Sequence, residues 1–335
     1  MSPTRLVSVT VRTLEWVDDH IDVVDQTALP QWRRVALRTV DDVVDAIGRL
    51  VVRGAPALGV LGALGVALAA RQHADGDLDA VRADADRIAS ARPTAVNLSH
   101  GVRAVLPAVE RGPDAALAAA RQLLEDDALA CAALSRRGAA LLRERVGPQP
   151  MVLATHCNAG ALACVDWGTA LGVVRALHGE GLVRMVLVGE TRPLLQGARI
   201  TATELVALDI PHRVIVDAAG PGLIATGAVD AVVVGADRVA ANLDVVNKVG
   251  TYGLALASAR AGIPFVVAAP ESTLDPVAPD GVAVTVEERD GAEVLQFGGH
   301  RVAPAESTAL NPAFDITPAD LVTAIVTESR VLHRT

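Results

Sequence analysis

The sequence predicts an α/β protein in which a Rossmann-like, doubly wound parallel sheet forms the C-terminal domain and a smaller, mainly helical domain precedes it. A chain of 335 residues is too long for one core of ordinary size. Its first part carries apolar residues at helical spacing, whereas its second part alternates short valine-rich runs with helical stretches. Gly147, Pro148 and Pro150 interrupt the chain between the two patterns, which divides it into domains of residues 1–146 and 147–335.

The first domain is expected to contain five helices. Residues 40–52 show apolar positions at helical spacing, and residues 55–71 are almost entirely apolar, as in a helix buried on most sides. Further helices are expected over residues 80–91, 95–109 and 114–145. The residues before Pro30 could add short strands.

The second domain is expected to alternate strands with helices. The expected strands cover residues 151–155, 184–188, 213–216, 231–234 and 264–268. The expected helical stretches cover residues 161–177, 194–208, 222–227 and 248–261. Strands that are apolar throughout are typical of a parallel sheet covered on both faces, and no dinucleotide-binding fingerprint is present in the sequence.

Composition and charge argue against several classes of partner. No apolar run reaches the roughly 18 to 20 residues that a membrane span needs, and residues 55–70 are better interpreted as a core helix. The start of the chain lacks a basic-then-apolar signal, so we expect a cytoplasmic protein without membrane contact. A formal charge of −9 and the lack of a basic stripe with aromatics argue against nucleic acid.

The cysteines predict neither disulfides nor a metal site. Cys131, Cys157 and Cys164 are too few, and odd in number, for a disulfide framework. No cysteine or histidine pair has the spacing of zinc ligands. We therefore expect no metal and no redox cofactor.

Polar and reactive residues follow four of the apolar runs. They occupy residues 155–160, 189–193, 235–238 and 268–271. Because ligands bind at the carboxyl ends of the strands in such sheets, this coincidence predicts an enzyme or a ligand-binding domain.

Two of these residues are candidates for catalysis. A following helix and the neighbouring His156 would favour the thiolate of Cys157, although a free cysteine is often just a small buried residue. Asp237 could act as an acid or base if burial raises its pKa above about 3.9. It could equally cap a helix or pair with Arg238. Cys131 and Cys164 are expected in the core.

Three basic groups stand before predicted helices and are candidate phosphate ligands. They are Arg53-Gly54-Ala55-Pro56, Arg92-Pro93-Thr94 and Asn247-Lys248. A helix N-terminus and a cation together form an anion site, although any one of these cations could be a solvated surface residue. Since two groups belong to the first domain, a phosphate is expected in the cleft between the domains.

With these motifs the chain, over residues 5–330, resembles the methylthioribose-1-phosphate isomerases of methionine salvage. The matching stretches are residues 53–59, 92–98, 155–163, 190–193, 196–199, 235–238, 247–252 and 311–315. The resemblance implies a two-domain fold, a homodimer and a small sugar-phosphate substrate. It also implies that Asp237 donates a proton and that Cys157 is the other essential catalytic residue. The substrate-binding residues that it implies are Arg53, Gly54, Ala55, Arg92, Gln196, Asn247 and Lys248.

The resemblance implies conversion of 5-methylthioribose 1-phosphate into 5-methylthioribulose 1-phosphate, but it leaves alternatives open. The family often has an aromatic residue in place of Thr203, glycine in place of Leu243, and a glycine-rich turn near residues 165–167. Relatives act on 5-deoxyribose 1-phosphate or ribose 1,5-bisphosphate. Others are non-enzymatic regulatory subunits of a nucleotide-exchange factor in translation initiation.

Overall fold

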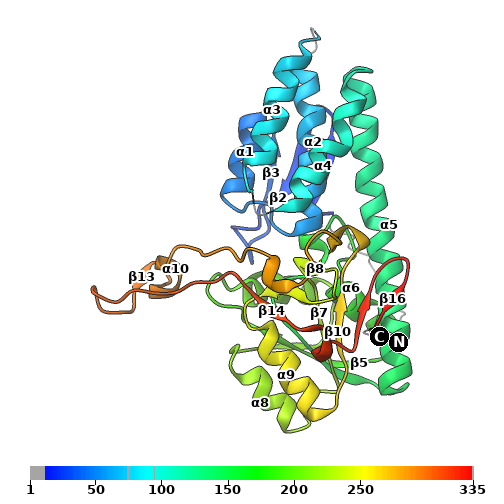
Figure 1. The fold of residues 1–335 in the computed structure, drawn as a ribbon, viewed down its shortest axis with the longest axis vertical. Coiled ribbons are helices and arrows are strands. Elements are labelled where there is room, and N and C mark those ends of the chain that lie inside the picture. The colour runs from blue at the N-terminus through cyan, green and yellow to red at the C-terminus, as the bar shows by residue number, and fades with distance from the viewer. Residues whose placement is uncertain (1–11, 74–75, 94, 334–335) are drawn as a thin grey trace, which may run out of the picture.

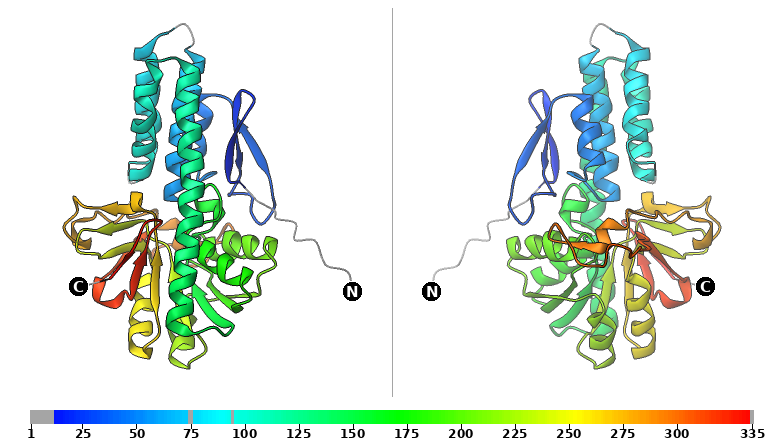
Figure 2. Two further views of the ribbon diagram at one scale, coloured as in Figure 1. Left: turned by 90° about the vertical axis from the view of Figure 1, so that its right-hand side faces the viewer. Right: turned by 90° about the vertical axis from the view of Figure 1, so that its left-hand side faces the viewer.

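The computed structural model describes residues 12–73, 76–93 and 95–333 and shows a mixed α/β fold built around a largely parallel sheet (Figure 1). Thr94, part of one predicted phosphate group, lies outside the described residues. Figure 2 shows the helices of the first part standing above the large sheet, with a small antiparallel sheet against their side.

The first part contains the five expected helices and three strands. The strands β1 (Leu14–Val17), β2 (His20–Val24) and β3 (Arg34–Leu37) form an antiparallel sheet in that order. The helices are α1 (Val40–Gly48), α2 (Ala55–Gln72), α3 (Leu78–Ser90), α4 (Val96–Val109) and α5 (Pro113–Val146). The five predicted helices are thereby confirmed, whereas β3 lies beyond Pro30, where no strand was expected.

Helix α2 is the centre of this part. Within the described residues it is a helix long and apolar enough to cross a membrane, yet 78% of it is buried inside the protein, which is the pattern of a core helix. It packs closely on α4, because a Cβ added to Gly101 would lie 1.8 Å from the carbonyl oxygen of Gly59. Small residues at this crossing therefore set the position of the α2 N-terminus.

The second part is built on a seven-stranded sheet. Its order is β16-β15-β10-β7-β4-β5-β6, and only β16 runs antiparallel to its neighbour. The strands are β4 (Met151–Thr155), β5 (Val183–Gly189), β6 (His212–Ile215), β7 (Ala231–Val234), β10 (Phe265–Ala268), β15 (Ala324–Val326) and β16 (Val331–Leu332). The five expected strands are confirmed, and β15 and β16 were not expected.

Both faces of this sheet are covered, which explains its continuous apolar runs. Helix α6 (Ala170–Gly179) and the C-terminal half of α5 share one apolar cluster with Val233 of β7. Helices α8 (Ala219–Ala225) and α9 (Thr251–Ala261) share the other cluster with Val232 and Val234. Neighbouring residues of one strand thus enter opposite cores, so no position is left for polar side chains.

The second part also contains a four-stranded sheet and a projecting arm. The small sheet has the order β11 (Leu274–Asp275), β8 (Arg238–Ala240), β9 (Val245–Lys248) and β14 (Phe314–Thr317). Between β11 and β14, residues 284–313 form an arm that extends away from the body in Figure 1. It contains α10 (Ala292–Leu295), β12 (Gln296–Phe297) and β13 (His300–Arg301). Neither feature was expected from the sequence.

The expected helix over residues 161–177 is confirmed only from Ala170, where α6 begins, and is wrong for the residues before it. The chain makes a short 3₁₀ turn, η1 (Ala161–Ala163), and then a loop up to α6. Trp167 and Gly168 have φ values of 63° and 85°, in the left-handed region that interrupts a helix. Leu243 also has a positive φ of 70°. Leu243 and the neighbourhood of Trp167 are the places where the resembling family often has glycine, and here Trp167 and Leu243 adopt a backbone conformation that favours glycine.

Two other expected helices begin later than predicted. Residues 194–208 form a π-helical turn, η2 (Gly197–Thr201), followed by α7 (Ala202–Ala207). Helix α9 begins at Thr251, and therefore Asn247 and Lys248 belong to strand β9.

Thr203, where the family often has an aromatic residue, donates a hydrogen bond to the carbonyl oxygen of Arg199 at 2.6 Å.

Candidate active site

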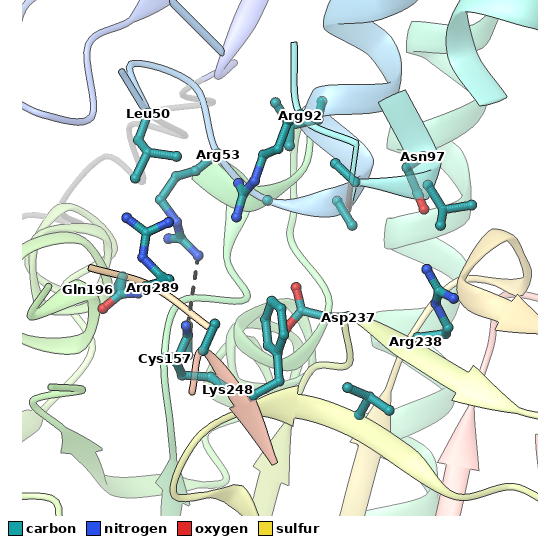
Figure 3. A pocket seen from close by; sticks show the side chains of 18 of the residues that line it. Leu50, Arg53, Arg92, Asn97, Cys157, Gln196, Asp237, Arg238, Lys248 and Arg289 are labelled. Carbon is teal, nitrogen blue, oxygen red and sulfur yellow. Dashed lines mark hydrogen bonds between the residues drawn. The ribbon is translucent and has the colours of Figure 1, made fainter. Parts of the chain in front are cut away.

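All nine residues predicted for the site line two adjoining cavities between the α2 N-terminus and the carboxyl ends of the sheet strands. The larger cavity, drawn in Figure 3, is lined by Arg53, Gly54, Ala55, Arg92, Cys157, Gln196, Asp237 and Lys248. The smaller shares five of them and adds Asn247. Residues more than 190 positions apart in the sequence thus meet at one place.

Gly54 brings the first part of the chain onto the loop after β4. Its φ is 97°, and a Cβ at this position would lie 2.3 Å from the carbonyl oxygen of Ala163. Only glycine permits both this conformation and this approach. As a result Arg53 reaches the loop: its Nη2 lies 3.7 Å from Sγ of Cys157, and its Nη1 donates to Oδ1 of Asn158 at 3.2 Å.

Cys157 is held in an unusual backbone conformation. Its φ is 62°, which is costly for a residue with a side chain and persists only where the surrounding structure holds it. Its amide donates to Oγ1 of Thr191 at 2.9 Å, and its carbonyl accepts from Oγ1 of Thr201 at 2.6 Å. These two bonds fix the thiol at the edge of both cavities, with only 8% of the residue exposed.

The surroundings of Cys157 differ from those expected. The next α-helix begins only at Ala170, so Cys157 does not stand at a helix N-terminus. The ring of His156 turns away, and its Nε2 donates to the carbonyl oxygen of Val249 at 2.8 Å. Burial lowers the pKa of His156 and favours its neutral form. The cation in contact with the thiol is therefore Arg53, and Lys248 also lies close enough to interact with it electrostatically.

A buried glutamate behind Asn158 was missed by the sequence reasoning. Oε1 of Glu204 accepts a hydrogen bond from Nδ2 of Asn158 at 2.6 Å. Burial raises the pKa of Glu204 to about 7. The side chains of Glu204, Asn158 and Arg53 thus form a hydrogen-bonded series that ends at Cys157. The only signal in the sequence is one acid within the otherwise uncharged residues 200–208.

Asp237 follows β7, and its exposed surface opens on both cavities. It caps no helix, because the next element is strand β8, and Arg238 pairs instead with Asp275 at 3.2 Å. The surrounding protein raises the pKa of Asp237 by removing water, while Lys248 and Arg53 oppose this effect. A bound ligand would displace the remaining water and raise that pKa further.

Polar side chains from β9 and from the loop after β5 complete the walls of the two cavities. Lys248 is 8% exposed, its Nζ lies 4.8 Å from the ring centre of Phe314, and burial lowers its pKa. Nδ2 of Asn247 donates to Oγ1 of Thr251 at 2.9 Å. Oε1 of Gln196 is buried and has no hydrogen-bond partner among the described residues.

The larger cavity combines positive charge with apolar lining residues. Arg289 from the arm, which the sequence reasoning missed, joins Arg53, Arg92 and Lys248. Such a cluster of cations in a chain of formal charge −9 indicates an anionic ligand. The lining also includes the apolar residues Leu50, Leu58, Val96, Leu194, Val284 and Phe314. Within the described residues no three His, Cys, Asp or Glu side chains gather as metal ligands would.

This chain is similar to known proteins over most of its length. The model of the initiation factor 2 subunit family matches residues 51–333. A methylthioribose-1-phosphate isomerase of Anaeromyxobacter sp. (strain Fw109-5) is 48% identical over 94% of this chain and 92% of its own. A probable bifunctional methylthioribose-1-phosphate isomerase/methylthioribulose-1-phosphate dehydratase of Nocardia farcinica is 52% identical over 96% of this chain, which spans 59% of that relative.

Two solved structures share the fold over nearly the whole chain. One is 5-methylthioribose 1-phosphate isomerase from Pyrococcus horikoshii, with 34% identity, a TM-score of 0.90 and coverage of 99% of this chain and 95% of the other. The other is described as translation initiation factor eIF-2B, subunit delta, from A. fulgidus, with 40% identity, a TM-score of 0.86 and coverage of 97% and 96%. The chain therefore belongs to the initiation factor 2 subunit family and, within it, to the methylthioribose-1-phosphate isomerases.

Proposed function

We propose that this protein is an aldose–ketose isomerase of methionine salvage that converts 5-methylthioribose 1-phosphate into 5-methylthioribulose 1-phosphate. The observation that carries the proposal is the composition of one cavity. It holds a carboxyl of raised pKa at Asp237, a thiol at Cys157, and cations and apolar side chains on its walls. The names of the relatives at 44–52% identity support the same reaction.

Ring opening is the first chemical task in this proposal. The phosphate on the anomeric carbon prevents the sugar from opening spontaneously, so the enzyme must protonate the ring oxygen. Asp237 is suited to this because desolvation by the surrounding protein raises its pKa, which favours the protonated form over that of an ordinary carboxyl. Arg53, Arg92 and Lys248 bind the phosphate, and this remote binding energy holds the opened sugar in place.

Hydrogen must then move from carbon 2 to carbon 1. One route passes through an enediolate, with Cys157 as the base. The other is a direct hydride shift in which Cys157 assists at the neighbouring hydroxyl. A reaction in deuterated water separates the two: deuterium at carbon 1 of the product argues against a pure hydride shift, although a shielded base could also retain the original hydrogen.

The group at carbon 5 of the sugar decides the choice of substrate. The apolar part of the lining, with Leu50, Val96, Leu194 and Phe314, favours a methylthio or methyl group over a second phosphate. On this ground 5-deoxyribose 1-phosphate is the alternative substrate, and ribose 1,5-bisphosphate ranks below both.

A second candidate function is that of a translation-factor subunit. It is favoured by the 40% identity to the structure described as a translation initiation factor subunit. A binding module of that kind has no need for a buried thiol next to an acid of raised pKa. Loss of all isomerase activity together with specific binding to a translation factor would support this candidate.

The test follows both sugars by phosphorus NMR with the wild type, Cys157→Ala and Asp237→Asn. The proposal expects the wild type to convert the methylthio sugar faster and both variants to lose more than about a hundredfold in rate. Cys131→Ala, a buried thiol in α5, and Asp209→Asn, an exposed carboxyl, serve as matched controls. No turnover of either sugar by the wild type, or full activity in both site variants, would contradict the assignment.

We further propose the domain division at residue 147, a Rossmann-like second domain, a homodimer and a cytoplasmic location. The covered sheet supports the second domain. Light scattering of the purified protein tests the dimer.

A further inference from the structure

The arm of residues 284–313 contributes to the lining of the larger cavity at both of its ends. Val284, Thr285 and Arg289 line the cavity where the arm leaves the small sheet, and Ala313 lines it where the arm returns. The hairpin of β12 and β13 lies beyond them, away from the body (Figure 1). The arm therefore closes a side of the site that neither the helices nor the large sheet reaches.

Arg289 is oriented by carboxylates of the arm itself. Its Nε donates to Oε2 of Glu293 at 3.0 Å, its Nη2 donates to Oε1 of the same residue, and its Nη1 donates to Oε1 of Glu287 at 3.0 Å. Nδ2 of Asn311, at the other end of the arm, also donates to Oε2 of Glu293 at 3.0 Å. The guanidinium is thus fixed before any ligand enters, and Figure 3 shows it pointing into the cavity that Arg53 also enters.

Glu287 stands between two arginines that line the cavity. One carboxylate oxygen accepts from Arg289, and the other lies 3.6 Å from Nη2 of Arg92. This contact joins the arm to the first part of the chain. It also places one negative charge against two cations and so reduces their mutual repulsion.

We propose that Arg289 is a further ligand for the anionic group of the substrate, and that Glu287 is the counter-ion of Arg289 and Arg92 until that group arrives. A phosphate carries more charge and more acceptor oxygens than a carboxylate, so it can take over the hydrogen bond that Arg289 donates to Glu287 and the ion pair that Arg92 makes with it. The inference rests on the proposed function only for the identity of the anion, which is a phosphate.

The two residues then have opposite effects on anion binding. Arg289→Gln removes a charged donor and should weaken the binding of inorganic phosphate about tenfold or more. Glu287→Gln removes the competing carboxylate and should strengthen it about threefold. The measurement is calorimetric titration of the whole protein with inorganic phosphate in low-salt buffer. Arg301→Gln, which alters an arginine bonded to arm carbonyls outside the cavity, is the matched control and should leave the affinity unchanged.

Two more variants separate binding by Arg289 from support of the arm. Arg289→Lys keeps the charge and should recover most of the phosphate affinity. Glu293→Gln breaks the contact that orients the arginine but leaves its charge, and should change the affinity less than about threefold. Equal losses in Arg289→Gln and Glu293→Gln would mean that Arg289 only supports the arm, which overturns the inference. So would wild-type affinity in Arg289→Gln, or no phosphate binding by the wild type.

Failure of this inference is distinguishable from failure of the proposed function, because phosphate binding is measured without turnover. A protein that binds phosphate through Arg289 but converts neither sugar contradicts the isomerase assignment and leaves the anion site standing. A protein that converts the methylthio sugar with an unchanged KM in Arg289→Gln contradicts only the role of Arg289.

Discussion

Replacing Glu204 with glutamine tests the buried hydrogen-bonded series behind Cys157. Glu204 is 6% exposed, and burial raises its pKa to about 7. The acid is therefore largely neutral in the folded protein at pH 6, whereas in the unfolded chain it is ionised. Glutamine keeps an oxygen that can accept from Nδ2 of Asn158 but can never ionise.

The sign and size of the effect follow from the two pKa values. A carboxyl whose pKa is raised on folding contributes its full stability below the ordinary value of about 4.5 and loses it as the pH rises through about 7. A rise from 4.5 to about 7 corresponds to about 3 kcal/mol. The variant does not suffer this loss. Relative to wild type, it should therefore gain about 3 kcal/mol between pH 4 and pH 8, or roughly 4 °C in Tm for a chain of this size.

The assay is thermal unfolding of both proteins at several pH values between 4 and 8. Any constant cost of the substitution cancels, because only the change in the Tm difference with pH matters. Glu144→Gln, at an exposed position of α5, is the control and should show a Tm difference that does not vary with pH. A constant Tm difference for Glu204→Gln would refute the reasoning, since the glutamate would then titrate at its ordinary pKa when folded.

Two further substitutions test the geometry of the cavity. Lys248→Met removes a cation that lowers the pKa of Asp237. The alkaline limb of the pH profile of kcat/KM should therefore move to higher pH, and KM should rise. If the limb does not move, Asp237 is not the acid. Gly54→Ala forces a Cβ to 2.3 Å from the carbonyl oxygen of Ala163 and should lower kcat/KM at least about a hundredfold. Gly48→Ala, where nothing lies within 4 Å, should leave kcat/KM unchanged, and equal effects at both glycines would contradict this account.

Much of the fold could be predicted from local patterns. The five helices of the first part follow from apolar spacing, and the five central strands follow from runs such as residues 231–234. The topology also predicts that Cys157 and Asp237 lie at the same site, because parallel strands end at one edge of their sheet. The roles of the nine site residues stay predictions until the variants are measured.

The features that were missed depend on tertiary contacts. The two-residue strand β16 and the arm have no periodicity of their own, and the arm reaches the cavity only because β14 pairs with β9. Glu204 has an ordinary neighbourhood in the sequence and becomes unusual only when the loop after β4 buries it. Arg289 looked like one of many surface arginines, and its position in the cavity follows from its bonds to Glu287 and Glu293.

The opposite pKa shifts of Asp237 and Lys248 link substrate binding to acid catalysis. Removal of water by the surrounding protein raises the pKa of the acid and lowers that of the lysine, which favours the neutral form of each. The negative charge of a phosphate beside them attracts the cationic form of Lys248 and repels the ionised form of Asp237. A bound phosphate therefore favours a charged lysine and a protonated aspartic acid. By linkage, phosphate affinity must fall as the pH rises through the pKa of Asp237. In Asp237→Asn this part of the decline should disappear and only the part due to Lys248 remain. If the two proteins show the same decline, the substrate does not help to hold the catalytic proton.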